Sequence, residues 1–134
     1  MSNHSAYRTF VDRLSKTKDS AREKSTKKRK SLGLRTAREN LDDLVDPGSF
    51  LEFGAFAVAA QRNRRDYEEL QLETSADGIL TGFCNINEDE VGEDNSHAAA
   101  IIYDYSVLAG SQGFFHHQKL DRICEKAEEF SLSL

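Results

Sequence analysis

The chain has 134 residues, 38% hydrophobic and 31% charged, a polar composition that is still within the range of globular domains. Its formal charge of −5 hides an asymmetry, because residues 1–38 contain 12 Lys and Arg against 3 Asp and Glu, whereas residues 39–134 contain 6 against 20. No stretch approaches the roughly 20 apolar residues that cross a bilayer, and the start lacks the apolar core of a secretory signal, so we expect a cytoplasmic protein without a membrane partner.

The first part of the chain is predicted to be a basic arm, helical or flexible, over residues 1–34, ahead of a separate unit over residues 35–134. Between residues 16 and 30 hardly any apolar side chain occurs, so this stretch is interpreted as solvated or as docked on the acidic body. A short apolar stripe at helical spacing precedes it, formed by Tyr7, Phe10, Val11 and Leu14.

A short capped helix is predicted over residues 36–45. Thr36 and Glu39 have the spacing of a capping box, in which the Thr side chain accepts from a first-turn amide and the Glu reaches back. The Pro47-Gly48 pair then ends the helix, because Pro cannot continue one and Gly favours a turn.

The middle of the chain shows strand and turn signals. Aromatic residues favour a short strand at 50–53, and alternation after the Asp77-Gly78 turn favours another at 79–86. A continuous apolar run indicates a buried strand at 97–105. The intervening segments are predicted as a charged loop or short helical turn (61–72) and an acidic connection (87–95).

The last helix has the clearest pattern in the chain. Its apolar face is predicted to contain Leu120, Ile123, Cys124 and Ala127, with Phe130 near the same side. The final residues SLSL resemble a loop that enters another strand. Strand, helix and a further strand form a βαβ unit, so the sequence predicts an α/β fold that continues beyond this unit.

A small-residue loop lies between the last predicted strand and this helix. Gly110, Ser111 and Gly113 precede a helix end whose free amides attract an anion such as phosphate. The spacing fits neither GxGxxG nor GxxxxGK[ST], so a plain strand-to-helix turn is the alternative.

Other candidate sites are weaker. The cluster KKRK at 27–30 fits a phosphate-binding patch, but no aromatic residue lies between Arg13 and Arg38 to stack on bases, so nucleic acid is disfavoured. The adjacent His116 and His117 point in different directions on a helix, and the two cysteines are far apart. No metal site is therefore expected.

Three stretches in chain order resemble one family. They are TARENLDDLVDPGSFLEFGAFA, ADGILTG (76–82) and YDYSVLAGSQGFFHHQKLDRICEKA. Together they resemble the beta-type carboxyltransferase subunit or domain of the biotin-dependent acyl-CoA carboxylases, which act on acetyl-, propionyl- or methylcrotonyl-CoA, and specifically its N-terminal part. The matching positions are Arg38, Glu39, Asn40, Leu41, Leu44, Asp46, Gly48, Ser49, Phe50, Glu52, Asp104, Val107, Gly110, Ser111, Gly113 and Lys119, with His116 or His117 nearby.

The resemblance implies a crotonase-like superhelix of ββα units, incomplete here, whose backbone amides stabilise an enolate. It implies transfer of CO2 from carboxybiotin to an acyl-CoA, with biotin on a partner carrier domain, a biotin carboxylase as a further partner, and a homo-oligomer. The CoA contacts implied are Gly110, Ser111, Gly113 and Lys119. Because the acidic body repels CoA phosphates, basic residues have to be concentrated locally.

The resemblance also has departures. The family's Gly-rich oxyanion loop follows the strand that begins near residues 131–134, and its second domain is not in this sequence, so we expect no catalytic residue here and no activity of the chain alone. Ala109 and Ser106 replace a family Gly and Thr. The alternative is a non-catalytic binding module whose basic arm engages nucleic acid or an acidic partner.

Overall fold

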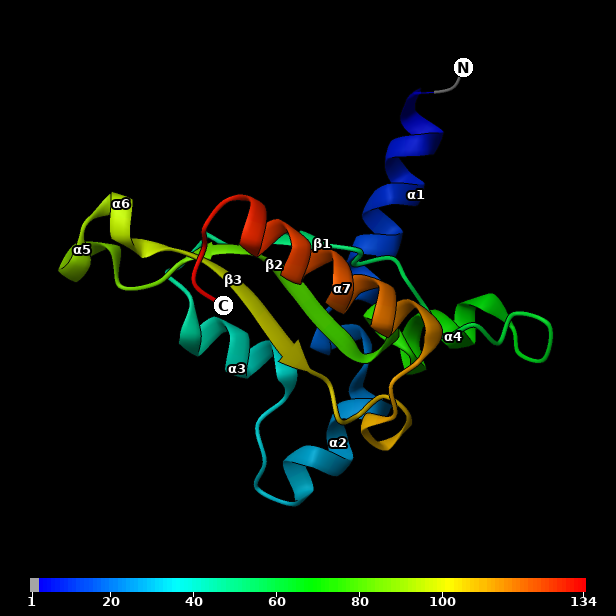
Figure 1. Ribbon diagram of the computed structural model, residues 1–134. Helices are drawn as coiled ribbons and strands as arrows, with labels where there is room; N and C mark the ends of the chain where they lie inside the picture. The colour runs from blue at the N-terminus through cyan, green and yellow to red at the C-terminus, as the bar shows by residue number, and fades with distance from the viewer. Residues whose placement is uncertain (1–2) are drawn as a thin grey trace.

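The computed structural model describes residues 3–134 as a three-stranded sheet between helices, with one helix projecting from the body (Figure 1). Short 3-10 turns occupy residues 19–21, 75–78 and 108–110. The helices are α1 (Asn3–Lys16), α2 (Glu23–Ser31), α3 (Ala37–Leu44), α4 (Tyr67–Glu73), α5 (Glu88–Val91), α6 (Glu93–Ser96) and α7 (Phe114–Glu129), and the strands are β1 (Leu51–Phe53), β2 (Ile79–Asn85) and β3 (His97–Tyr103).

The sheet has the order β1-β2-β3 with antiparallel neighbours. Successive side chains of β3 point to opposite faces, as the pleat requires. Ala98 and Ala100 pack with Leu41 of α3, whereas Ala99 packs with Ile123 of α7. Two helices therefore cover the two faces of a narrow sheet, which confirms the predicted strands and the last helix.

One glycine is required by the close approach of β1 to β2. A Cβ built on Gly82 would lie 2.2 Å from the carbonyl oxygen of Leu51 and 2.6 Å from the ring of Phe50. Real side chains do not tolerate such contacts with backbone atoms. The glycine in the ADGILTG stretch thus lets the strands pair.

Side chains cap the starts of helices α3 and α4. At α3, Thr36 accepts from the Glu39 amide at 3.1 Å and Glu39 accepts from the Thr36 amide at 2.8 Å, so the capping box is confirmed. The charged segment 61–72, predicted as a loop or short helical turn, contains α4, whose start is capped by Asp66.

The end of the chain pairs with β3 at one residue, as expected of a segment that leads into a further strand. Ser133 forms a parallel bridge with Ala98, and the Ala99 amide donates to the Ser133 carbonyl at 2.8 Å. Strand β3, helix α7 and Ser133 thus make the first contact of a parallel βαβ unit.

The predicted buried face of α7 is wrong at Cys124, whose side chain is exposed, and Phe130 is also exposed. The buried residues of the helix are His116, Ile123 and Ala127. These lie at i, i+7 and i+11, so the apolar stripe turns toward His116 and leaves Cys124, one residue or about 100° beyond Ile123, at the surface.

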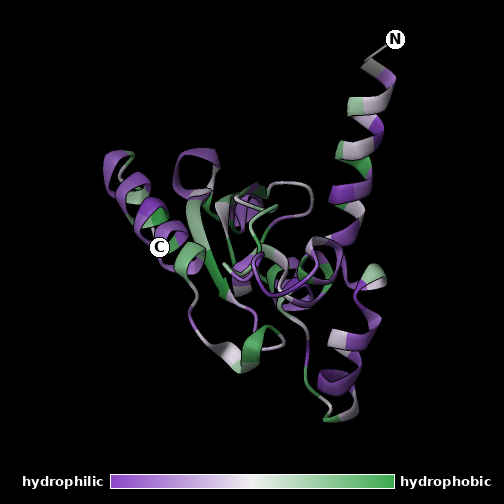
Figure 2. Ribbon diagram, turned by 90° about the vertical axis from the view of Figure 1, so that its right-hand side faces the viewer, coloured by the Kyte–Doolittle hydropathy of each residue, from purple (hydrophilic) through white to green (hydrophobic). Residues whose placement is uncertain are grey.

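The N-terminal arm divides into two parts. Helix α1 projects from the body (Figures 1 and 2). Its stripe of Tyr7, Phe10, Val11 and Leu14 is exposed. In contrast, Arg22 in the following segment is only 3% exposed. The stretch 16–30 is therefore docked on the body, which is one of the two alternatives that the sequence allows. Within residues 3–134 no helix has the length and apolarity to cross a membrane.

Candidate functional site

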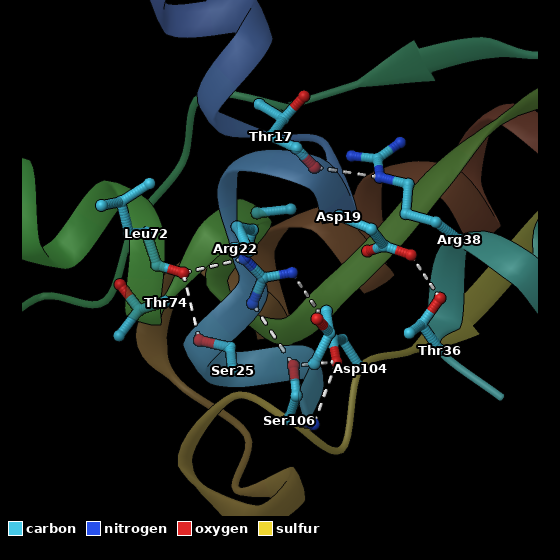
Figure 3. A network of polar contacts seen from close by, with 12 residues as sticks. Thr17, Asp19, Arg22, Ser25, Thr36, Arg38, Leu72, Thr74, Asp104 and Ser106 are labelled. Carbon is cyan, nitrogen blue, oxygen red and sulfur yellow. Dashed lines mark hydrogen bonds and ion pairs between the residues drawn. The ribbon is translucent and has the colours of Figure 1, made fainter. Parts of the chain in front are cut away.

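A buried ion pair fastens the arm to the stretch that leads into the Gly loop (Figure 3). The Arg22 guanidinium donates to Asp104 Oδ2 at 3.0 Å, to the Leu72 carbonyl at 2.8 Å and to Ser106 Oγ at 3.3 Å. Asp104 is 5% exposed, so both charges are withdrawn from water. A buried pair of this kind holds only because further hydrogen bonds satisfy both groups.

Asp104 also shapes the start of the loop. Its Oδ1 accepts from the Ser106 amide at 2.9 Å and from the Ser106 hydroxyl at 2.6 Å. The side chain therefore binds its own backbone two residues on, as in an Asx-turn. In consequence, the arm residue Arg22 fixes the conformation in which the chain leaves β3.

A second ion pair joins residues of the first family-like stretch. Both Nη atoms of Arg38 donate to the Glu52 carboxylate, at 2.7 and 2.9 Å, in the bidentate geometry that is strong for arginine. Arg38 Nε also donates to the Thr17 carbonyl at 3.2 Å (Figure 3). The pair thus links α3, β1 and the arm.

The turn before β2 is conformationally strained. Ala76 and Asp77 have φ of 55° and 48°, and Gly78 follows with φ of 76°. Left-handed φ values cost a non-glycine residue free energy, and they persist only where the surrounding structure holds them. The contacts that hold this turn come from the start of α7.

The carboxylate of Asp77 occupies the N-terminus of α7. Its Oδ2 accepts from the His116 amide at 2.9 Å, and a Cβ built on Gly113 would lie 2.6 Å from each carboxylate oxygen. Asp77 is 1% exposed. The anion that this helix end attracts is therefore the protein's own carboxylate, and Gly113 is needed for its close approach.

Two side chains of α7 bind the backbone of the same turn. Lys119 Nζ donates to the Ala76 carbonyl at 2.9 Å and to the Ile79 carbonyl, and His116 Nδ1 lies 3.1 Å from the Asp77 carbonyl. The stretches ADGILTG and GSQGFFHHQK therefore interlock. Residues far apart in sequence thus form one unit. The first stretch supplies the hydrogen-bond acceptors, and the second stretch supplies the donors.

Burial changes the acid–base behaviour of both α7 side chains. It lowers the pKa of Lys119 from its usual 10.5 to about 8, although the Glu52 carboxylate works in the opposite direction. Burial also lowers the pKa of His116, which favours the neutral ring beside Tyr103. Perturbed groups of this kind concentrate at functional sites, but they also arise in scaffolds.

The depressed pKa of Lys119 predicts a pH dependence of stability. Between pH 8 and 10.5 the unfolded chain holds the lysine proton and the folded chain has released it, so rising pH stabilises the folded form. From pH 8 to 10 the wild type should gain about 1–3 kcal/mol relative to Lys119→Met, measured by urea unfolding. The variant Lys18→Met, which removes an exposed lysine, is the control. If the free energies of unfolding of the wild type and of Lys119→Met change with pH in parallel, the prediction is contradicted.

An apolar hollow of about 240 Å³ lies beside this unit, between α7 and the segment after β1. The aliphatic stem of Lys119 forms one wall and lies so close to Gly54 that a Cβ built on this glycine would be 3.0 Å from it. A larger hollow of about 1110 Å³ lies between α1, α3 and residues 47–57. Residues 3–134 contain no convergent group of three His, Cys, Asp or Glu side chains.

The four residues predicted to contact CoA do not converge on one point. Ser111 is exposed, and Gly110 is partly exposed and approaches the ring of Tyr105. Gly113 and Lys119 face inward and serve the strained turn. Their predicted contact with CoA stays a prediction. Sequence reasoning missed the partners Arg22 and Asp77, because both act over long sequence separations.

The chain is similar to subunits of acyl-CoA carboxylases and carboxyltransferases. The beta4 subunit of the biotin-dependent long chain acyl-coenzyme A carboxylase of Mycobacterium tuberculosis (strain ATCC 25618 / H37Rv) is 33% identical over 114 residues, which are 85% of this chain and 19% of that protein. The methylmalonyl-CoA carboxyltransferase 12S subunit of Propionibacterium freudenreichii subsp. shermanii is 35% identical over 106 residues, 78% of this chain and 18% of that protein. No family model matches the chain.

Solved structures agree with these relatives. A single-chain, multi-domain long-chain acyl-CoA carboxylase matches 95% of this chain with a TM-score of 0.90 and 45% identity, and the match covers 13% of that protein. The transcarboxylase 12S crystal structure, described as a hexamer assembly, matches 91% of the chain with a TM-score of 0.68 and 28% identity, over 22% of its own length. The fold is thus an incomplete piece of the crotonase-like α/β architecture of carboxyltransferase domains. The chain belongs to the carboxyltransferase family of biotin-dependent acyl-CoA carboxylases, and it spans about a fifth of the length of the curated relatives it matches.

Proposed function

We propose that the chain forms part of an acyl-CoA carboxyltransferase, which transfers CO2 from carboxybiotin to the carbon next to the thioester carbonyl of an acyl-CoA. The observation that carries the proposal is the match to the long-chain acyl-CoA carboxylase, with a TM-score of 0.90 and 45% identity over 95% of the chain. The relatives act on several acyl groups, so the substrate is proposed as the class of acyl-CoA esters.

The role of the described residues is to build and hold a wall of the site. Carboxyl transfer requires paired N–H donors that stabilise the enolate of the thioester in a dry pocket. At the start of α7 the His116 amide is already bound by Asp77, which argues against an enolate site there. We therefore place no catalytic residue within residues 3–134 and expect the chain to be inactive alone.

The partners follow from the same proposal. Biotin would arrive on a carrier domain that a biotin carboxylase loads, and the working assembly would be a homo-oligomer in the cytoplasm. The names of the relatives support the biotin dependence and the oligomeric assembly, because one is a biotin-dependent carboxylase subunit and another is described as a hexamer. Of the residues predicted to contact CoA, Ser111 is exposed, and Gly110, Gly113 and Lys119 are partly exposed.

A bicarbonate-fixation assay tests the inactivity of the chain. The purified chain would be mixed with biotin carboxylase, biotinylated carrier protein, ATP, labelled bicarbonate and an acyl-CoA. We expect no acid-stable label above the level without the chain, whereas an intact carboxyltransferase in the same mixture provides the positive control. Turnover by the chain alone would overturn the assignment of catalysis to other parts of the enzyme.

A further inference from the structure

The amine of Lys119 is held by backbone carbonyls and not by a carboxylate. Its Nζ donates to the carbonyls of Ala76 and Ile79, and among residues 3–134 no acidic side chain forms an ion pair with it. A neutral amine has two N–H donors and one lone pair, whereas the ammonium form has three donors. The two carbonyls are therefore satisfied by the neutral amine, and its lone pair is left without a partner in this part of the chain.

The charged groups around this amine have other partners. The Glu52 carboxylate of β1 accepts from both Nη atoms of Arg38 in α3, and Asp77 in the strained turn accepts from the His116 amide. These groups influence the Lys119 amine through space, but none of them fixes its proton by direct contact. The amine thus differs from a lysine that is locked in a salt bridge.

The stem of Lys119 lines the apolar hollow of about 240 Å³ between α7 and the segment after β1. A Cβ built on Gly54, another residue of the wall, would be 3.0 Å from Cδ and Cε of the lysine, so Nζ is one bond from the edge of the hollow. Most of the remaining wall is apolar, from Phe53, Ala57, Phe115 and Ile123. Gln118 and Arg122 also line the hollow and are exposed, and Lys119 is partly exposed, so the hollow opens to solvent. Such walls suit a small uncharged acyl group, whereas an anion would lack hydrogen-bond donors there.

We propose that Lys119 is a modification site, whose amine is acylated by small acyl thioesters with the acyl group seated in this hollow. The lone pair of Nζ attacks the thioester carbonyl carbon and forms a C–N bond. The C–S bond then breaks, and an amine proton passes to the leaving thiolate, so the step needs no oxidant or reductant. The inference rests on the proposed function only for the source of the thioester, because acyl-CoA esters are the proposed substrates.

The acid–base behaviour of Lys119 supports this chemistry. Because burial lowers its pKa to about 8, roughly a quarter of the amine is neutral at pH 7.5, against about 0.1% for an ordinary lysine. Desolvation in an apolar pocket is a usual way of activating a lysine nucleophile. A nucleophile of lower pKa is also intrinsically weaker, so we expect a net advantage in rate of about tenfold.

Acylation changes the contacts of the strained turn. The amide that forms keeps a single N–H, so one of the carbonyls of Ala76 and Ile79 loses its donor. These contacts join α7 to the turn in which Ala76 and Asp77 have positive φ. We therefore expect the acylated chain to unfold at a lower urea concentration than the unmodified chain.

The test is site-resolved mass spectrometry of the full chain after incubation with S-acetyl-N-acetylcysteamine, a thioester without a nucleotide, and in parallel with acetyl-CoA. At pH 7.5 both reagents should acetylate Lys119 about tenfold faster than the exposed Lys18. The rate at Lys119 should level off above pH 8, whereas the rate at exposed lysines should continue to rise about tenfold per pH unit toward pH 10.

A matched pair of variants tests the role of the hollow. Ala57→Leu narrows it and should slow acetylation of Lys119 about fivefold. Ala55→Leu, two residues away, lies in the wall of the larger hollow and should change this rate less than about twofold. Neither variant should alter the rate at Lys18, which serves as the internal reference in each sample.

The outcomes separate this inference from the proposed function. Acetylation of Lys119 no faster than that of Lys18, or equal slowing in the two leucine variants, would overturn the modification site. Acetylation by acetyl-CoA alone would overturn it as well, because the nucleotide and not the hollow would then direct the thioester. Carboxyl transfer by the assembled enzyme is judged separately, by the segment exchange described in the Discussion.

Discussion

Replacing Arg22 by alanine is expected to lower the free energy of unfolding by about 3–5 kcal/mol, because it leaves the buried Asp104 carboxylate without its positive partner. The substitution also removes the donor to the Leu72 carbonyl. Since Arg22 joins the arm to the stretch before the Gly loop, we further expect faster hydrogen exchange in α2. Urea unfolding followed by circular dichroism, with exchange measured by mass spectrometry, gives both results.

The control for this prediction is a surface ion pair just after the arm. Arg35 donates to Asp43 at 3.0 Å, but their side chains are 53% and 68% exposed. Arg35→Ala should therefore leave stability almost unchanged, because solvent screens such a pair. If the two alanine variants unfold at the same urea concentration, the Arg22–Asp104 contact does not hold the arm in place.

Replacing Asp77 by alanine is expected to cost about 2–4 kcal/mol, because the His116 amide then lacks its buried acceptor and the end of α7 loses its charge. Asp77→Asn keeps the shape of the side chain and should cost less than the alanine variant. Urea unfolding at neutral pH measures both changes. Hydrogen exchange of the amides in the first turn of α7 shows whether the loss of stability is confined to this end of the helix.

Asp66 provides the matched comparison, because it also caps a helix but lies at the surface. It accepts from the Glu68 amide at 3.0 Å at the start of the seven-residue helix α4. Asp66→Ala should cost only about 0.5–2 kcal/mol, the usual loss for an N-cap. A cost for Asp77→Ala no larger than this would show that Asp77 is an ordinary cap and does not join the two family-like stretches.

Features encoded within a few residues were predictable from the sequence. The Thr36–Glu39 capping box and the strand after Asp77-Gly78 are confirmed, and the end of the chain makes one parallel bridge at Ser133. Each depends on neighbours in sequence, so local propensity and periodicity contain the required information.

Features that depend on distant residues were not predictable in this way. Arg22 lies in a polar stretch that reads as solvated, yet its partner Asp104 is 82 residues away. Likewise, the sequence allows either an external anion or a plain strand-to-helix turn at the loop before α7, and it does not reveal that the Asp77 carboxylate, 39 residues before His116, fills that position. Cys124 was placed on the buried face because the pattern did not reveal that His116 belongs to the core.

The central claim is that this chain is a working part of a carboxyltransferase that lacks the catalytic groups. The most direct measurement is acyl-CoA carboxylation by the beta4 subunit of the Mycobacterium tuberculosis enzyme after its 114 matching residues have been exchanged for those of this chain. We predict that the exchanged subunit fixes labelled bicarbonate with its biotin-dependent partners. An exchanged subunit that folds and assembles like its parent but carboxylates no acyl-CoA would contradict the claim.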